Sequence, residues 1–171
     1  AEIAAGYADT NDFEFLEIHN PTNAAVNLTN WRLSGGVSFT FPVGRTIPAN
    51  GFLIVTSFDP ALPANTARLT AFRTKYGLAA SVPLIGGYSG QLSDGGESVR
   101  LLRPDDPPLG EPNFFPGLTE DAVDYDDIVP WPTAAAGLGR SLTRNSVTAY
   151  GHDPANWTAR LPSPGLLNPI E

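Results

Sequence analysis

Residues 13–57 contain short runs of aromatic and branched residues, each closed by turn residues. The runs alternate in polarity, as at Phe39 and Phe41, which flank Thr40 and follow Ser38. Alternation with a period of two places one set of side chains on a core and the other in solvent, which is the pattern of a β-strand. We therefore expect strands in the segments FEFLEIHN, VNLTNWRLSGG, VSFTFP and FLIVTS.

The segment LTAFRTKYG departs from this pattern and predicts the one real helix of the chain. Leu69, Phe72 and Tyr76 fall on a single helical face. Gly77 follows them and can end the helix in a left-handed conformation. The single lysine, Lys75, is expected to face solvent.

More strands are expected after the helix. Asp94-Gly95 before SVRLL indicates a hairpin, AVDYDD alternates apolar residues with aspartates, and residues 141–144 have the pattern of a last short strand. Residues 153–157 are expected to form a turn that carries Trp157 as an anchor. Seventeen prolines and seventeen glycines among closely spaced strands favour an all-β sandwich with one short helix.

The net charge of the chain arises in one segment. The chain has 18 acidic residues and 10 lysines and arginines, and between Arg103 and Arg140 it has eight acids and no base. The remaining ten acids and ten bases cancel, so the segment accounts for the whole charge of −8. Such a face repels a polyanion, and we expect no nucleic-acid binding. The eight acids are Asp105, Asp106, Glu111, Glu120, Asp121, Asp124, Asp126 and Asp127.

The residue types that the chain lacks exclude some kinds of cross-link and metal site. Without cysteine it has neither disulfides nor thiolate metal sites. No stretch approaches the roughly 18 uninterrupted apolar residues of a membrane span, so membrane insertion is not expected. At 171 residues the chain fits one domain. Because it also lacks methionine, we expect it to be a piece of a longer protein.

Four motifs within the strand region occur in a characteristic order and spacing: Asn20-Pro21, Val26-x-Leu28-x-x-Trp31-x-Leu33, Phe39-x-Phe41-Pro42, and the turn Pro48-Ala-Asn-Gly51 before FLIV. On these motifs the sequence resembles the lamin tail domain, an immunoglobulin-like β-sandwich. Later segments extend the resemblance over nearly the whole chain and are similar to the bacterial branch of that family. They are AFRTKYG, YSGQLSDGGESVRLL, VDYDD, PWPTAAAGLGRSLTR and DPANW.

The resemblance implies one lamin-tail-like domain over residues 1–171. It implies a non-catalytic interaction or spacer module of a larger exported bacterial protein. Such a module would be extracellular or at the cell surface, with a protein or cell-surface component as partner. The chain departs from the family in a proline-rich and acid-rich insertion at about residues 104–121, where the usual connection is shorter. A function peculiar to this chain is expected there.

A cluster of carboxylates is the first candidate site. Asp121, Asp124, Asp126 and Asp127 lie at one strand end, and Asp124 and Asp126 share one strand face. Ca²⁺ takes six to eight oxygen ligands, which such a loop can supply together with backbone carbonyls. The spacing does not match a calcium-loop motif, and a solvated acidic face is the alternative. No cofactor is expected apart from Ca²⁺ at this cluster, if the metal hypothesis holds.

Trp131 is the second candidate. Its large ring suits a sandwich core, as do those of Trp31 and Trp157. Its position between Pro130 and Pro132 beside the acidic strand also suits an exposed ring that stacks on a sugar. A core tryptophan and a carbohydrate-binding one are therefore both retained as interpretations.

Catalysis is not expected. The chain has no cysteine and no G-x-S-x-G elbow. His19 and His152 are expected to form hydrogen bonds at a strand end and a turn. A calcium-dependent or carbohydrate-binding module, or an accessory domain of a secreted hydrolase, remains an alternative to the interaction or spacer role.

Overall fold

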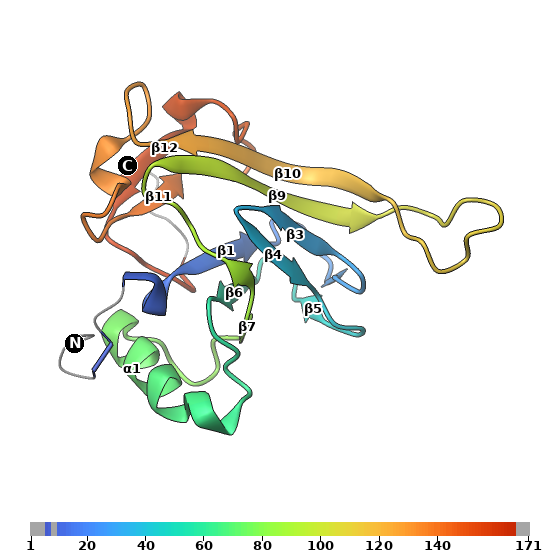
Figure 1. Ribbon diagram of the computed structural model, residues 1–171, viewed down its shortest axis with the longest axis horizontal. Coiled ribbons are helices and arrows are strands. Elements are labelled where there is room, and N and C mark those ends of the chain that lie inside the picture. The colour runs from blue at the N-terminus through green and yellow to red at the C-terminus, as the bar shows by residue number, and fades with distance from the viewer. Residues whose placement is uncertain (1–5, 8–9, 167–171) are drawn as a thin grey trace.

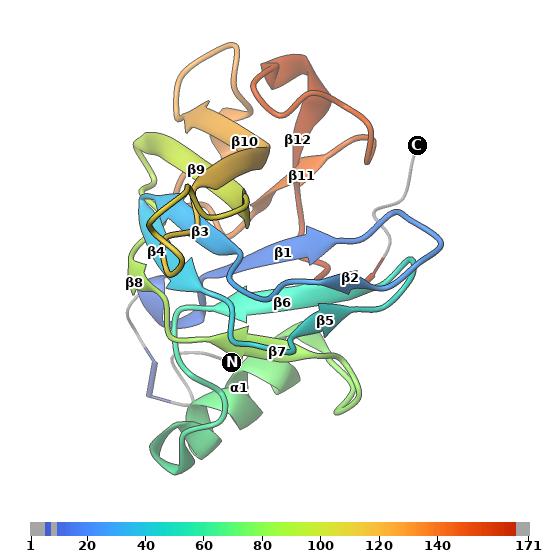
Figure 2. The same ribbon diagram turned by 90° about the vertical axis from the view of Figure 1, so that its right-hand side faces the viewer.

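The computed structural model describes residues 6–7 and 10–166, and its centre is a β-sandwich of the immunoglobulin-like type. One sheet contains β1 (Phe15–His19), β6 (Phe52–Thr56) and β7 (Leu84–Gly86), in the order β1-β6-β7. The other has the order β10-β9-β3-β4-β8. It consists of β3 (Arg32–Gly35), β4 (Val37–Thr40), β8 (Ser89–Gly90), β9 (Gly96–Pro104) and β10 (Gly117–Asp126). Figures 1 and 2 show the two sheets from two sides.

The main core lies between these sheets. Leu33 of β3 and Val37 of β4 meet Leu53 and Val55 of β6, and all four side chains are buried. The predicted alternation is therefore present on both sheets. The remaining buried members of this core are Leu28, Phe41, Ile47 and Tyr88.

Helix α1 (Thr66–Tyr76) covers the outer face of the three-stranded sheet (Figure 2). Phe72 is fully buried and contacts Ile54, whose side chain points away from the main core. Both faces of β6 are therefore covered, which explains why its sequence is continuously apolar. Leu69 and Tyr76 pack on the same side, and Gly77 ends the helix with φ 64°, as the sequence predicted.

Smaller elements complete the fold. β2 (Val26–Asn27) pairs with β5 (Thr46–Ile47), and β11 (Ser141–Arg144) pairs with β12 (Trp157–Arg160). Among residues 6–7 and 10–166, four 3-10 turns lie in the loops: η2 (Thr10–Phe13), η3 (Pro63–Asn65), η4 (Thr133–Ala135) and η5 (Pro154–Asn156). None of the helices in the described ranges is both long enough and apolar enough to span a membrane.

Several predicted strands have other bounds or other partners. The segment VNLTNWRLSGG is divided into β2 and β3, because Asn30 turns the chain with φ 63°. Asp94-Gly95 is a turn but forms no hairpin, since β8 pairs with β4 while β9 pairs with β3 and β10. That prediction was wrong because Asp-Gly is a local signal, whereas the partner of a strand is set by distant residues.

Four of the described strands were not predicted. β5 pairs with β2, β8 pairs with β4, and β7 joins the sheet parallel to β6. β12 starts at Trp157, the residue expected to end a turn, and it is the last strand of the described chain. All four strands have two to four residues, so none holds enough alternating residues to be recognised.

Of the segment 104–121 that was proposed as an insertion, residues 105–116 form the loop between β9 and β10, and residues 117–121 belong to β10. Whether the segment is an insertion relative to the family stays a prediction. The two strands form one long hairpin whose far end projects from the sandwich (Figure 1). We call residues 103–120 of this hairpin the arm.

Candidate functional site

The inner half of β10 is attached to the C-terminal hairpin by an ion pair. Arg144 of β11 donates to both carboxylate oxygens of Asp121, with Nη1 to Oδ2 at 2.7 Å and Nη2 to Oδ1 at 2.9 Å. The guanidinium also lies 4.9 Å from the ring centre of Trp157, its register partner on β12. Asp121 is therefore a structural anchor between two hairpins rather than an open carboxylate.

The other three predicted ligands have separate surroundings. Asp124 Oδ2 lies 3.1 Å from His152 Nδ1, and its Oδ1 lies 3.7 Å from Arg100 Nη2. The Asp126 carboxylate accepts from the backbone N–H groups of Asp127 and Ile128, which closes a local turn. As predicted, Asp124 and Asp126 lie on one face of β10.

The predicted calcium ligands do not converge on one point. Asp121 lies on the opposite face of the strand from Asp124, and Asp127 is exposed beyond the strand end. Within residues 6–7 and 10–166, no group of three or more His, Cys, Asp or Glu side chains is arranged to hold a metal ion. The geometry gives the calcium hypothesis no support, and it stays a prediction that a titration must test.

Trp131 lies inside the protein. Its side chain is 8% exposed, and its ring centre is 6.4 Å from that of Trp157. Trp157 Nε1 donates to the Gly151 carbonyl at 2.8 Å, which satisfies the polar end of a half-buried indole. These positions favour the core interpretation of Trp131. Stacking on a sugar requires an exposed ring face, so the structure does not support the carbohydrate-binding interpretation of this residue.

The two histidines are in structural positions. The ring of His19 stacks on Phe52 across the β1–β6 pair, with 4.5 Å between ring centres. His152 is paired with Asp124. In the described ranges, neither ring forms a hydrogen bond to a serine or threonine hydroxyl, so neither is part of a nucleophilic triad there.

A network of acids and tyrosines near one end of the sandwich was missed in the sequence. Glu14 accepts from the Tyr88 hydroxyl at 3.3 Å and from the Leu92 N–H at 3.0 Å. Tyr125 donates to Glu97 at 3.1 Å. Burial raises the pKa of Glu14 and, more strongly, the pKa values of both tyrosines. The hydroxyls therefore stay protonated and act as hydrogen-bond donors, and the Tyr125 bond to Glu97 links the end of β10 to the start of β9.

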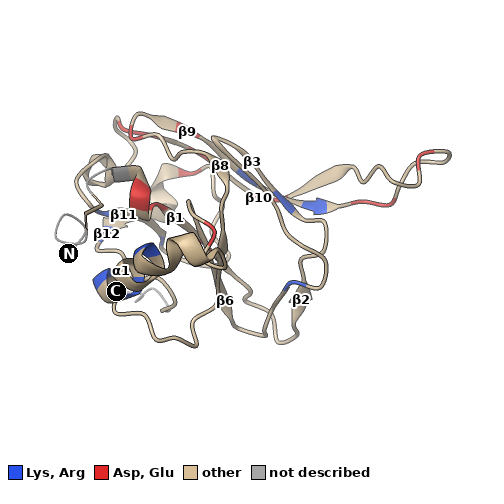
Figure 3. Cartoon of the chain, turned by 60° about the horizontal axis from the view of Figure 1, so that its bottom comes forward, with Lys and Arg blue, Asp and Glu red and all other residues tan. Residues whose placement is uncertain are grey.

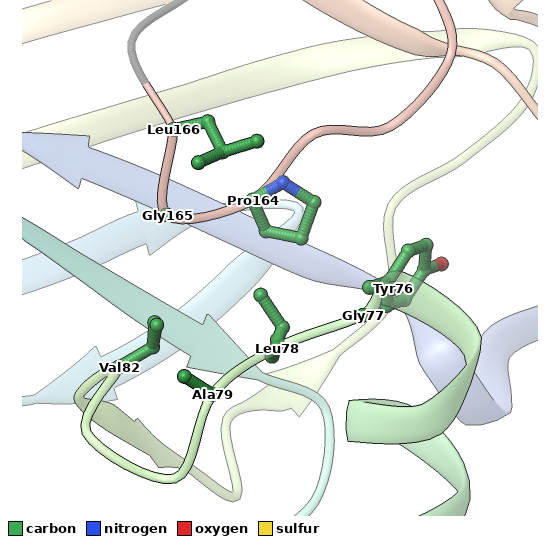
Figure 4. Close-up of a pocket in the computed structure, with 8 residues that line it drawn as sticks. All are labelled: Tyr76, Gly77, Leu78, Ala79, Val82, Pro164, Gly165 and Leu166. Carbon is green, nitrogen blue, oxygen red and sulfur yellow. The ribbon is translucent and has the colours of Figure 1, made fainter.

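A small apolar pocket lies where the end of α1 meets the C-terminal segment 164–166. Its volume is about 170 Å³. Figure 4 shows Leu78 and Val82 on one side and Pro164 and Leu166 on the other. Nearby, the Glu17 carboxylate accepts from the Gly165 N–H, and burial raises the pKa of Glu17 to about 7. The pocket has room for about one branched side chain and has no convergent polar groups for a larger ligand.

The arm projects away from the rest of the described chain (Figure 1). Its loop is ordered by turns, since Glu111 N–H donates to Pro108 O and Phe114 N–H to Glu111 O, both at 3.0 Å. At its base Asp105 N–H donates to Pro116 O at 2.8 Å, and Arg32 Nη2 to Phe115 O at 3.3 Å.

The side chains of the arm combine apolar groups with negative charge. Leu109 is fully exposed, and 53% of Phe114 is exposed to solvent. Three acids, Asp105, Asp106 and Glu111, lie in the same loop, which contains no Lys or Arg (Figure 3). An exposed apolar tip surrounded by charge of one sign is typical of a contact surface.

The comparisons with known proteins agree with this architecture. The family model described as Lamin Tail Domain matches residues 1–107. The match ends inside the loop of the arm, so the segments VDYDD, PWPTAAAGLGRSLTR and DPANW lie beyond it, and membership of the bacterial branch is not shown. No curated protein and no solved structure matches the chain. With more than half of its residues matched and a β-sandwich core, the chain belongs to the lamin tail domain family, whose members are non-catalytic structural modules.

Proposed function

We propose that this domain is a non-catalytic module that binds another protein or a cell-surface component through its arm. The projection of the arm from the sandwich supports this role, because it places Leu109 and Phe114 in solvent at no benefit to the core. Its internal turns and proline-rich loop reduce the entropy lost on binding. The parent is proposed to be a larger exported bacterial protein, on the resemblance alone.

The test compares three immobilised forms of the domain in extracts of the native host. They are the wild type, an arm-shortened variant in which Asn-Gly replaces residues 106–115, and the control Leu62→Ser. Leu62 is an exposed apolar residue beside η3, away from the arm. Retention of defined proteins by the wild type and Leu62→Ser, with loss from the arm-shortened variant, is the expected result.

Two other outcomes contradict the proposal. If all three forms retain the same proteins, binding occurs elsewhere on the domain. If none of them retains any, a spacer role replaces the interaction role. Circular dichroism and thermal unfolding of the arm-shortened variant must first show that the sandwich is intact.

A further inference from the structure

One edge of the five-stranded sheet is open at the arm. β10 is the last strand in the sheet order and forms strand pairs with β9 alone in the described chain. Its outer residues 117–120 are all exposed. An edge of this kind presents backbone N–H and C=O groups that have no partner strand.

The inner half of the same edge is closed. Gly151 lies so close to the Ala122 carbonyl oxygen that an added Cβ would be 2.0 Å from it. Asp121 and Asp124 are held by Arg144 and His152 from the same C-terminal region. A register shift between Thr119 and Asp121 separates this covered half from the exposed half. An added strand therefore has access to residues 117–120 only.

Edges that must stay unpaired are usually protected by lysines, prolines or inward-pointing charges. Residues 117–120 contain no lysine and no proline, and the one charge, Glu120, is paired with Arg103 of β9 at 3.1 Å. Leu118 is partly exposed on this segment. This segment therefore lacks the lysine and proline that block pairing at many edges, while the register shift at its inner end confines an added strand to residues 117–120.

The charges around this edge indicate which strand would pair with it. Asp105, Asp106 and Glu111 form no ion pair with any described residue, while Arg103 is already paired with Glu120. Leu109, Phe114 and Leu118 add apolar surface. A partner strand with lysines or arginines between apolar residues complements both features, whereas an acidic strand is repelled.

We propose that the outer edge of β10 binds an extended segment of a partner protein by strand addition, and that this segment alternates basic and apolar residues. Backbone hydrogen bonds to residues 117–120 supply the register. The acids of the loop and the apolar side chains of the arm select the sequence. The inference rests on the proposed interaction role of the arm. It specifies how the partner binds, by strand addition, and which residue types the partner segment contains.

The probe is a phage-displayed library of random 12-residue peptides, selected on the wild-type domain, and each enriched peptide is then tested for binding to the arm-shortened variant. We expect enriched peptides that contain Lys or Arg between apolar residues. Hydrogen–deuterium exchange with the best peptide should slow the amides of residues 117–120. Asp105→Asn/Asp106→Asn/Glu111→Gln should weaken its affinity at least about tenfold at low salt. The control Asp127→Asn, an exposed acid outside the arm, should leave the affinity unchanged.

The outcomes separate this inference from the proposed function. Peptides that need the arm but leave the amides of residues 117–120 unprotected overturn strand addition, while the interaction role stands. Protected amides with neutral or acidic peptides overturn the basic partner chemistry. If no peptide is enriched on the wild-type domain, strand addition falls, and the extract experiment alone then decides whether the arm binds anything.

Discussion

Arg144 holds both carboxylate oxygens of Asp121 while its guanidinium lies over the ring of Trp157. This pair connects the long β9–β10 hairpin to the short β11–β12 hairpin. The arm is therefore an extension of a strand that is anchored at its inner end, and the anchor lies beyond the stretch matched by the family model.

The first prediction concerns this anchor. Arg144→Ala should lower the free energy of unfolding by about 2 kcal/mol, because it removes two charge-assisted hydrogen bonds and a partly buried stacking contact. The control Arg103→Ala breaks a pair whose two side chains are both about half exposed, and should cost less than about 1 kcal/mol. Urea unfolding of both variants measures the difference. Equal losses would show that the Arg144 pair is an ordinary surface pair.

The second prediction concerns Trp131. If its ring is a core filler, Trp131→Ala should lower the free energy of unfolding by about 3–5 kcal/mol. Tyr150→Ala, at an exposed aromatic of the same region, should change it by no more than about 0.5 kcal/mol. An unchanged stability of Trp131→Ala would return the ligand-binding interpretation to consideration.

The third prediction concerns pH and Glu17. Burial raises the pKa of this carboxyl from its ordinary 4.5 to about 7, so between these values the native state binds the proton more tightly than the unfolded chain. Its contribution to stability is complete below about pH 4.5 and is lost as the pH rises through 7. Glu17→Gln removes this loss, since its side-chain oxygen can still accept from Gly165.

The measurement for Glu17 is the stability difference between variant and wild type at pH 5 and pH 8. We expect Glu17→Gln to gain about 1–2 kcal/mol on the wild type over this range, a value reduced for partial solvent screening. Asp127→Asn, at an exposed carboxylate, serves as the control and should show a flat difference. A flat difference for Glu17→Gln as well would mean that the carboxylate is well solvated and does not hold the C-terminal segment.

The fourth prediction concerns calcium. Because Asp121, Asp124 and Asp126 have separate partners, a calcium titration from EDTA should leave the melting temperature of the wild type unchanged. Asp124→Asn/Asp126→Asn should behave in the same way. A saturating rise in the wild type that is absent from the double variant would show binding to the native state and restore the calcium hypothesis.

Local patterns in the sequence were sufficient to predict the longer strands and the helix. Alternation of apolar residues identified β4, and a short apolar run before a turn residue identified β6, since both patterns are properties of each strand alone. The helical face of Leu69 and Phe72 and the stop at Gly77 were also readable, because capping depends on adjacent residues. The order and spacing of the early motifs indicated the family that the comparison then showed.

Only the tertiary structure decided which strands pair and which charged groups meet. β9 pairs with β3 and β10, and the four clustered aspartates separate because a strand directs neighbouring side chains to opposite faces and Arg144 binds only one of them. Trp131 is covered by Trp157, 26 positions away, and Glu17 by Gly165, 148 positions away. Burial and pairing depend on contacts between residues distant in the chain, so no local pattern could have placed the anchor, the apolar pocket or the open edge of the arm.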